Sequence, residues 1–273
     1  MTARTFVGSR PVDSLPEDSR GVAYGDGLFE TMRVHRGDVH WWDAHWSRLA
    51  HGATRLRIPL PNESMVRDHA AQLFGGADGV LKLILTRGAG GRGYAPAFDA
   101  EPVWLLSRHS TPAISRISGL VLRWCEMRLA MQPVLAGLKH CNRLEQIVAR
   151  GEWQDDGIDD GLMRDSDGFV VCATSANLFV LRGGRWLTPL IDRCGVAGIC
   201  RAWCLQETNA CETRLTVEDI ESSDAVFLCN AVRGILPVAR LHARAWPSHR
   251  DIVAVQVRLA HCHPAFASDQ EVS

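Results

Sequence analysis

A segment without regular apolar spacing divides this sequence into two halves, and each half carries both strand and helix patterns. The segment covers residues 109–118 and is rich in Ser and Thr. We therefore predict an N-terminal α/β domain over residues 1–110, a linker at 111–118 and a C-terminal α/β domain over 119–273. The junction of two such domains is the usual place for a ligand site.

The apolar periodicity also places individual elements. A strand at 28–35, a tight turn and a returning strand at 39–42 together predict a hairpin, and Asp43 is expected to cap a helix that ends at Leu56. Two further hairpins are expected to turn at 165–168 and 182–184. The other predicted helices are 62–74, 142–152, 195–206 and 252–261, and the other predicted strands are 80–86, 103–107, 120–124, 225–229 and 235–240. Helices and strands in both halves predict a mixed α and β fold.

The composition limits the class of protein further. Of the 273 residues, 46% are hydrophobic and 22% charged, and the formal net charge is -1, which excludes a disordered or coiled-coil chain and disfavours a nucleic-acid partner. No apolar run approaches the length of a membrane span, so no membrane partner is expected. The first residues lack a charged-then-apolar signal pattern, and we expect a cytoplasmic protein.

The cysteines agree with a reducing compartment and predict no metal site. The chain contains nine cysteines, an odd number, and no Cys-x-x-Cys pair. Cys200 and Cys204 are one helical turn apart, and residues 261–263 read His-Cys-His, but neither spacing matches a standard zinc ligand set. Five cysteines lie in apolar stretches and are predicted to be buried thiols: Cys125, Cys141, Cys172, Cys204 and Cys229.

Only two of the 30 basic residues are lysines, Lys82 and Lys139. Arginine stays charged and cannot form an imine, so covalent amine chemistry has two candidates. Lys139 has apolar neighbours in 135–138 that would bury its stem and lower its pKa, as a nucleophilic lysine requires, although a surface lysine in a loop is the alternative. Lys82 lies inside an alternating strand and is predicted to be structural.

Two glycine-rich segments are candidates for binding an anion. Residues 195–201 open a predicted helix, and free N–H groups at such a start attract phosphate, although an ordinary turn has the same pattern. No Gly-Lys-Ser/Thr follows, so this is not a Walker loop. The loop from Arg87 to Tyr94 could hold an anion through Arg87 and Arg92, or could be a plain connector.

Taken together in their order, the motifs of residues 24–238 resemble those of the fold-type IV pyridoxal-phosphate enzymes, and among these the aminodeoxychorismate lyases. The resemblance rests on Tyr24-Gly25-Asp26-Gly27-Leu28-Phe29-Glu30-Thr31, His45-Trp46-Ser47-Arg48-Leu49, the Arg-Gly loop ending at Tyr94, Gly137-Leu138-Lys139-His140-Cys141-Asn142-Arg143-Leu144-Glu145-Gln146, Ala176-Asn177-Leu178-Phe179, 195–201 and Cys229-Asn230-Ala231. Each motif is short, but the ordered set is specific.

The resemblance implies an α+β fold of two domains with pyridoxal 5'-phosphate at the domain interface, and a homodimer. Lys139 is implied as the covalent anchor of the cofactor and Arg48 as the phosphate ligand, while Thr31 is associated with lyase activity. The other implied cofactor residues are Asn177, Val196, Gly198, Ile199, Cys200, Asn230 and Ala231; Ala231 replaces a common threonine and offers backbone only. Arg92 and Tyr94 are expected to meet the carboxylates of a small-molecule substrate.

Cys172 departs from the family pattern. The family usually has a glutamate five residues before the Asn of Asn-Leu-Phe, where its carboxylate keeps the pyridine nitrogen protonated; here that position is Cys172. A neutral thiol is a poor partner for a pyridinium, so the ring would be a weaker electron sink.

The implied activity is conversion of 4-amino-4-deoxychorismate to p-aminobenzoate and pyruvate, a step of folate biosynthesis. This elimination ends in an aromatic ring and tolerates a weak electron sink better than transamination does. Two alternatives stay open: a transaminase for D- or branched-chain amino acids, and a non-catalytic protein that binds the cofactor.

Overall fold

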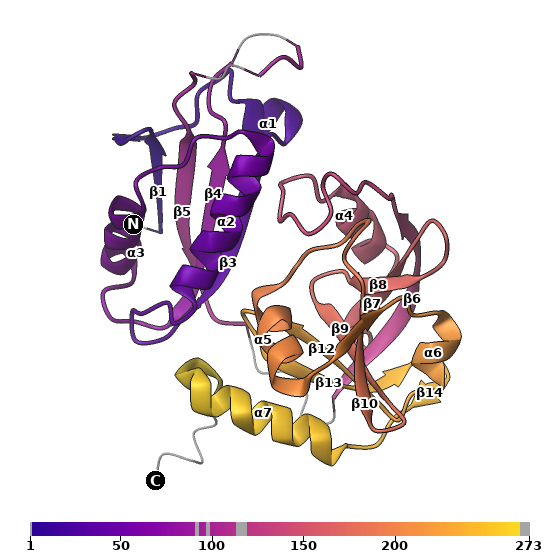
Figure 1. Ribbon diagram of the computed structural model, residues 1–273. Coiled ribbons are helices and arrows are strands. Elements are labelled where there is room, and N and C mark those ends of the chain that lie inside the picture. Colours follow the sequence, from indigo (N-terminus) through magenta and orange to yellow (C-terminus); the bar gives the residue numbers. More distant parts are fainter. Residues whose placement is uncertain (1, 91–92, 97–98, 113–118, 268–273) are drawn as a thin grey trace. The chain divides into compact units, whose positions relative to one another are not determined.

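The computed structural model describes residues 2–90, 93–96, 99–112 and 119–267 (Figure 1). The chain forms two compact units. The first comprises Met1–Pro112 and Leu138–Asn142, and the second comprises Ala113–Gly137 and Arg143–Ser273. The expected linker lies at the division, but its residues 113–118 are outside the described residues. The domain limits at 110 and 119 therefore stay a prediction.

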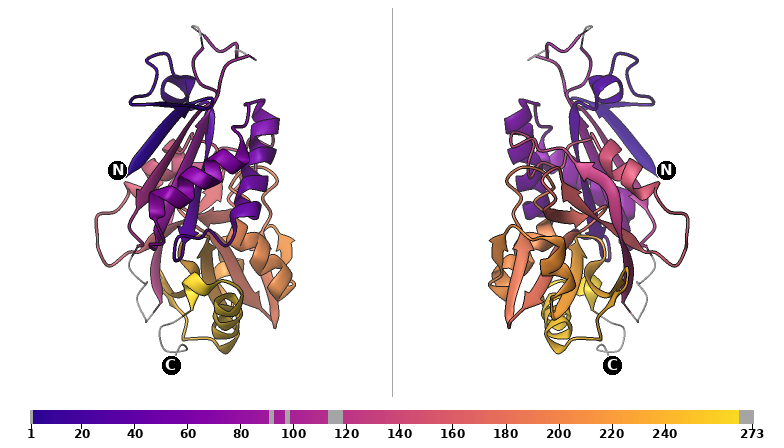
Figure 2. Two further views of the ribbon diagram at one scale, coloured as in Figure 1. Left: turned by 90° about the vertical axis from the view of Figure 1, so that its left-hand side faces the viewer. Right: turned by 90° about the vertical axis from the view of Figure 1, so that its right-hand side faces the viewer.

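The first unit contains a five-stranded antiparallel sheet with helices packed on one face (Figures 1 and 2). Its strands are β1 (Ala3–Val7), β2 (Arg10–Val12), β3 (Gly27–Val34), β4 (Gly79–Thr86) and β5 (Val103–His109), and their order is β2-β1-β5-β4-β3. Its helices are α1 (Arg20–Tyr24), α2 (Trp42–Leu56) and α3 (Glu63–Phe74). Asn62 caps α3 through the N–H of Met65, and Gly75 ends that helix in the left-handed region, as the sequence predicts.

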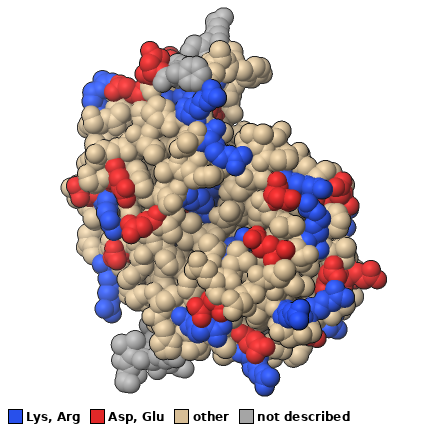
Figure 3. Space-filling view, viewed as in Figure 1, with Lys and Arg blue, Asp and Glu red and all other residues tan. Residues whose placement is uncertain are grey.

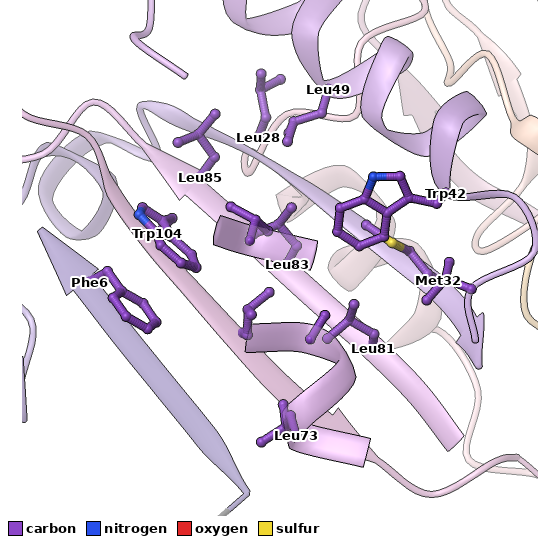
Figure 4. Packing of buried hydrophobic residues seen from close by; sticks show 14 of the residues in the cluster. Phe6, Leu28, Met32, Trp42, Leu49, Leu73, Leu81, Leu83, Leu85 and Trp104 are labelled. Atoms are coloured by element: carbon purple, nitrogen blue, oxygen red, sulfur yellow. The ribbon is translucent and has the colours of Figure 1, made fainter. Parts of the chain in front are cut away.

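Strict alternation along β3 decides which side chains meet the helices. Leu28, Met32 and Val34 are buried, and Leu28 and Met32 pack against Leu49 of α2 in one core cluster, most of which Figure 4 shows. Successive strand residues point to opposite faces, so the residues between them face away from the helices. Glu30 is on the buried, helix-facing side of this strand.

The hairpin predicted at 28–42 is wrong. Strand β3 pairs with β4 instead, from Gly27 opposite Thr86 to Val34 opposite Gly79. Helix α2 begins at Trp42, directly after the turn, and its N-cap is Trp41 rather than Asp43. A short alternating run cannot specify its partner, and the β4 run offers a longer apolar strand.

The free edge of β3 is covered by the chain segment that contains Lys139. The N–H of Phe29 donates to the carbonyl of Lys139 at 2.9 Å, and the N–H of Cys141 donates to the carbonyl of Gly27 at 2.9 Å. The sequence prediction assigned Lys139 to the C-terminal domain. In the structure its segment belongs to the first unit, because these backbone hydrogen bonds attach it to β3.

The second unit is built on one nine-stranded sheet. Its strands are β6 (Leu120–Leu129), β7 (Asp160–Asp165), β8 (Val170–Ala173), β9 (Asn177–Arg182), β10 (Arg185–Pro189), β11 (Cys211–Thr213), β12 (Ala225–Asn230), β13 (Gly234–Leu241) and β14 (Arg244–Ala245). The order is β11-β10-β9-β12-β13-β6-β7-β8, with β14 beside β13. The sheet curls, because β8 at one end also contacts β9 and β10.

Helices complete the second unit. They are α4 (Leu144–Arg150), α5 (Ile199–Thr208), α6 (Val217–Glu221) and α7 (Arg250–Cys262), followed by a 3-10 turn, η1 (Pro264–Phe266). The hairpins predicted at 165–168 and 182–184 are confirmed as β7–β8 and β9–β10. Helix α5 begins four residues later than predicted, because Gly195 has a φ of +87° that belongs to a turn.

Surface charge agrees with the balanced composition. Acidic and basic side chains are interspersed on the face that Figure 3 shows, without an extended area of one sign. Among the helices of the described residues, none has the length and apolarity that crossing a membrane requires.

Candidate active site

Lys139 lies against the outward face of β3. Its Nζ is 4.3 Å from the centroid of the Phe29 ring, and the Nζ of Lys82 is 5.5 Å from the same centroid. Thr31 is two residues from Phe29 and pairs with Lys82 across the strands, so both are on this face of the sheet. Both lysines of the chain therefore lie beside one aromatic ring, on the face of the sheet that carries Thr31. The sequence predicted Lys139 as the reactive lysine and Lys82 as a structural one, and the resemblance pointed to Thr31.

The opposite face of β3 holds a buried network of charged and polar groups. Glu30 accepts hydrogen bonds from Arg48 Nε at 2.8 Å and from Arg48 Nη2, and it lies 2.6 Å from His45 Nδ1. Glu30 and His45 are each 1% exposed, whereas Arg48 is 13% exposed. His45 and Arg48 are three residues apart on α2 and therefore share one helix face. Glu30 thus fixes the direction of the Arg48 guanidinium.

Protonation states in this network follow from its geometry. Burial would raise the pKa of the Glu30 carboxyl, but the Arg48 charge and the His45 hydrogen bond outweigh it and lower that pKa to about 2. Burial lowers the pKa of His45, and the nearby charges of Arg48 and Lys139 lower it further. A neutral His45 with its proton on Nδ1 donates to the Glu30 carboxylate. The sequence analysis assigned no role to Glu30 or His45. Glu30 is a carboxylate on the apolar face of a strand, and this position could have indicated a buried charged group.

The predicted anion loop has a different role where the structure describes it. Arg87 is buried, pairs with Asp26 at 2.7 Å and donates to the carbonyls of Leu56 and Arg57. These partners occupy its guanidinium, so the expectation that Arg87 holds an anion is wrong. Tyr94 is 87% exposed, and its ring meets that of Tyr24 edge-on at 5.5 Å. Arg92 lies outside the described residues.

In the second unit, the glycine segment before α5 leads into a helix start whose first N–H groups form a cradle, while the N–H of Ala197 in that segment donates to the carbonyl of Gly137. Gly198 is the N-cap of α5, and within the described residues no side chain caps this helix. The N–H groups of Ile199 and Cys200 follow in its first turn, where a helix start binds anions. Taken one by one, these groups fit pyridoxal 5'-phosphate: the Lys139 amine of the first unit can react with an aldehyde, and the Arg48 guanidinium of that unit and the uncapped start of α5 in the second unit are each of the kind that binds phosphate.

The side chain of Asn177 contacts the backbone of this cradle and fixes its shape. Its Nδ2 donates to the carbonyl of Val196 at 2.9 Å, and a Cβ at Gly198 would lie 2.1 Å from its Oδ1. Position 198 therefore accepts glycine only, because any side chain would collide with the amide. Similarly, Asn230 Oδ1 accepts from the N–H groups of Val232 and Arg233 and shapes the turn that contains Ala231.

Cys172 lies on β8, opposite Met163 of β7, and is buried. Burial raises the pKa of its thiol to about 12, with the Cys194 and Asp160 groups adding to the rise and Arg143 opposing it. The thiol is therefore neutral at pH 7.

The sequence analysis did not single out Asp160, a buried carboxylate whose Oδ1 accepts from the N–H and hydroxyl of Thr174, at 3.1 and 2.5 Å.

These features define a class of enzyme. The sequence matches the family described as amino-transferase class IV over residues 27–241, and the chain belongs to this family. Its fold is fold-type IV, an α+β fold with a curled sheet.

Similarity to particular members narrows the comparison. A curated aminodeoxychorismate lyase of Vibrio harveyi is 34% identical over 248 residues, which are 87% of this chain and 91% of the relative. The crystal structure of 4-amino-4-deoxychorismate lyase from Pseudomonas aeruginosa superposes with a TM-score of 0.88 at 41% identity and covers 94% of this chain and 98% of that chain. A putative branched-chain-amino-acid aminotransferase of Methanocaldococcus jannaschii is 26% identical over 82% of this chain and 81% of the relative.

Proposed function

We propose that this chain is a pyridoxal-phosphate-dependent lyase that converts 4-amino-4-deoxychorismate to p-aminobenzoate and pyruvate. Support comes from the lyase relatives at 34% and 41% identity, which exceed the transaminase relative at 26%. The observation that carries the proposal is the position of Lys139, whose amine lies beside Phe29 on the Thr31 face of β3.

We propose that the groups of both units bind one cofactor molecule, and chain connectivity supports this. The N–H of Gly137 donates to the carbonyl of Gly195, and the N–H of Ala197 donates to the carbonyl of Gly137. Gly137 precedes Lys139 by two residues, so the segment that leads into Lys139 is bonded to the glycine segment within the second unit. Arg48 and the N–H groups of Val196, Gly198, Ile199 and Cys200 would hold the phosphate, together with Asn230 and Ala231.

The residues of the chain then divide the work. When bound, the cofactor supplies an electron-withdrawing ring that acidifies the C–H next to the substrate amine. The Lys139 amine would remove that ring proton as general base; the ring C–O bond then breaks, the enolpyruvyl group leaves with its electron pair and takes up a proton to become pyruvate, and the substrate ring becomes aromatic. Thr31 positions the leaving side of the substrate, while Tyr94 and Arg92 meet its carboxylates. Glu30 holds Arg48 in a fixed direction, and Asn177 keeps the cradle open.

The neutral Cys172 thiol favours elimination over transamination. The family usually has a carboxylate at this position, which keeps the pyridine nitrogen protonated. A neutral thiol cannot do so, and the cofactor ring is therefore a weaker electron sink. Transamination depends on that sink, whereas formation of an aromatic ring has its own driving force.

To test the function, the cofactor-loaded protein is mixed with 4-amino-4-deoxychorismate, and fluorescence of p-aminobenzoate is followed. We expect equal amounts of p-aminobenzoate and pyruvate. Conversion of the cofactor to its amine form by D- or branched-chain amino acids, without p-aminobenzoate, would identify a transaminase. If neither reaction occurs, the protein is a non-catalytic cofactor binder.

Cys172→Glu is expected to make the protein a better transaminase. A carboxylate at this position strengthens the electron sink, and lowering the barrier by about 1.4 kcal/mol raises the rate roughly tenfold. The measurement is the rate at which D-alanine or leucine converts the bound cofactor to its amine form, followed by absorbance. Cys172→Ser, neutral and of similar size, is the control. Equal rates for the two variants would contradict this role of position 172.

We also propose a cytoplasmic homodimer. The nine cysteines, all within the described residues, are free thiols, as a reducing compartment requires. Helix α4 exposes Leu144, Ile147 and Val148 by 74%, 64% and 55%, and their spacing puts them on one face. Its other side is anchored by the buried Ala149. An exposed apolar helix face of this kind suits an interface with a second copy of the chain.

Ile147→Glu is expected to weaken this dimer. A charge on the apolar face must be desolvated on association, which costs several kcal/mol when it is unpaired. Light scattering after gel filtration should change from twice the 30.1 kDa chain mass to the single mass. Val253→Glu, at an apolar position of α7 that is 47% exposed, is the matched control and should stay dimeric. A dimeric Ile147→Glu protein would place the interface elsewhere.

A further inference from the structure

Three cysteines that are far from Lys139 in the sequence converge in the interior of the second unit. Cys200 and Cys204 lie one turn apart on α5, and Cys229 comes from the neighbouring strand β12. Their sulfur atoms lie within 4.8 Å of one another, and each residue is 0% exposed. Sequence spacing alone did not predict a metal site, because the third sulfur is supplied by tertiary structure.

A buried cation lies beside this cluster, because Arg201 directly follows Cys200 on α5. Arg201 is 6% exposed, and its Nη2 bonds to Pro189 and Glu212. Its Nε is buried and has no hydrogen-bond partner in the part of the chain that the structure describes. A guanidinium with spare donor capacity thus lies near a group of sulfurs that must lose protons to bind a metal.

The geometry selects the kind of ion. A metal–sulfur distance of about 2.3 Å places three sulfurs of a trigonal-planar site about 4.0 Å apart, so the cluster needs only a small contraction. Structural zinc requires four ligands, and the cluster offers three ligand groups within the described ranges. Sulfur ligands and low coordination number suit monovalent copper, a soft ion.

We propose that Cys200, Cys204 and Cys229 form a buried three-sulfur site for monovalent copper. On binding, three sulfur–copper bonds form, the three S–H bonds of the cluster break, and three protons pass to solvent. No electron is transferred, because the copper enters and stays monovalent. The site shares Cys200 with the proposed phosphate cradle, but copper would use its side-chain sulfur whereas the phosphate would use its backbone N–H.

The experiment titrates the cofactor-loaded protein with monovalent copper under anaerobic conditions, in competition with a chromophoric copper(I) chelator. We expect one tightly held ion per chain and no comparable retention of Zn²⁺. Loss of outer-sphere support typically costs 10- to 100-fold in metal affinity, so Cys204→Ala or Cys229→Ala should cost more than about tenfold. Cys125→Ala, which removes a buried thiol outside the cluster, and Cys211→Ala, which removes an exposed one, should bind as the wild type does.

X-ray absorption on the unaltered protein keeps the proposal testable if a variant fails to fold. We expect three sulfur neighbours at about 2.3 Å from the copper. Two sulfurs in a linear arrangement would overturn the three-sulfur site. Copper retained equally by all four variants would show adventitious binding only, and equally tight Zn²⁺ would overturn the selectivity.

Discussion

Replacing Lys139 by alanine is expected to lower the rate of p-aminobenzoate formation by at least about 10²- to 10⁴-fold, the range for a lost general base. The variant also loses the amine to which the cofactor is joined. Its near-visible absorbance should therefore lack the band of the bound cofactor after gel filtration. A Lys139→Ala protein that kept both its yellow colour and its turnover would contradict the assignment.

Lys82 provides the decisive comparison, because it is the other lysine of the chain and lies beside the same Phe29 ring. Lys82→Met should still hold the cofactor covalently. Borohydride reduction followed by mass spectrometry of peptides locates the bond directly. We expect the cofactor mass on the peptide with Lys139 in the wild type and in Lys82→Met, and on no peptide in Lys139→Ala. Label on Lys82 would transfer the role to that residue.

Glu30→Gln is expected to destabilise the protein by about 3 kcal/mol, because breaking a buried ion pair leaves the remaining charge without compensation. Arg48 then keeps its charge with a neutral amide beside it, and cofactor phosphate should bind more weakly. Urea unfolding measures the first effect and cofactor titration the second. Glu101→Gln is the matched control, since Glu101 pairs with Arg10 at the surface, with side chains 58% and 70% exposed. Such a pair contributes at most about 1 kcal/mol.

The same network predicts a pH dependence. The pKa of Glu30 is lowered to about 2 by folding, so its contribution to stability is complete above the unfolded value near 4.5. As the pH falls from there towards 2, the folded protein must take up this proton and the stability is lost. In Glu30→Gln, unfolding free energy should fall less steeply over this range. Equal slopes for wild type and variant would mean that another carboxylate controls acid unfolding.

Much of the fold could be predicted because local patterns carried it. Apolar spacing located α2, α3 and α7, and glycine turns located both hairpins of the second unit. The predicted 28–42 hairpin was wrong because strand pairing depends on contacts between residues far apart in the sequence, and β3 pairs with β4. Short elements such as α6, with its Thr216–Asp219 capping box, were missed because five residues give too few periods.

Some residues of the candidate site could likewise be predicted from local sequence patterns, whereas others depend on contacts between distant residues. Lys139 could be singled out because lysine is so rare in this chain, and the glycines before α5 because they open a helix. Arg87 was misjudged because its partners, Asp26 and the carbonyls at the end of α2, come from distant residues. The Glu30–His45 pair and the three-sulfur cluster also depend on tertiary contacts.

The pairing of the Lys139 segment with β3 bears on the order in which the chain can fold during its synthesis. Gly27 and Phe29 find these backbone partners only in residues 139–141. A nascent chain that has emerged only as far as residue 112 therefore carries an open strand edge, the feature by which unfinished proteins adhere to one another. The first unit is completed only after residues 138–142 have also left the ribosome.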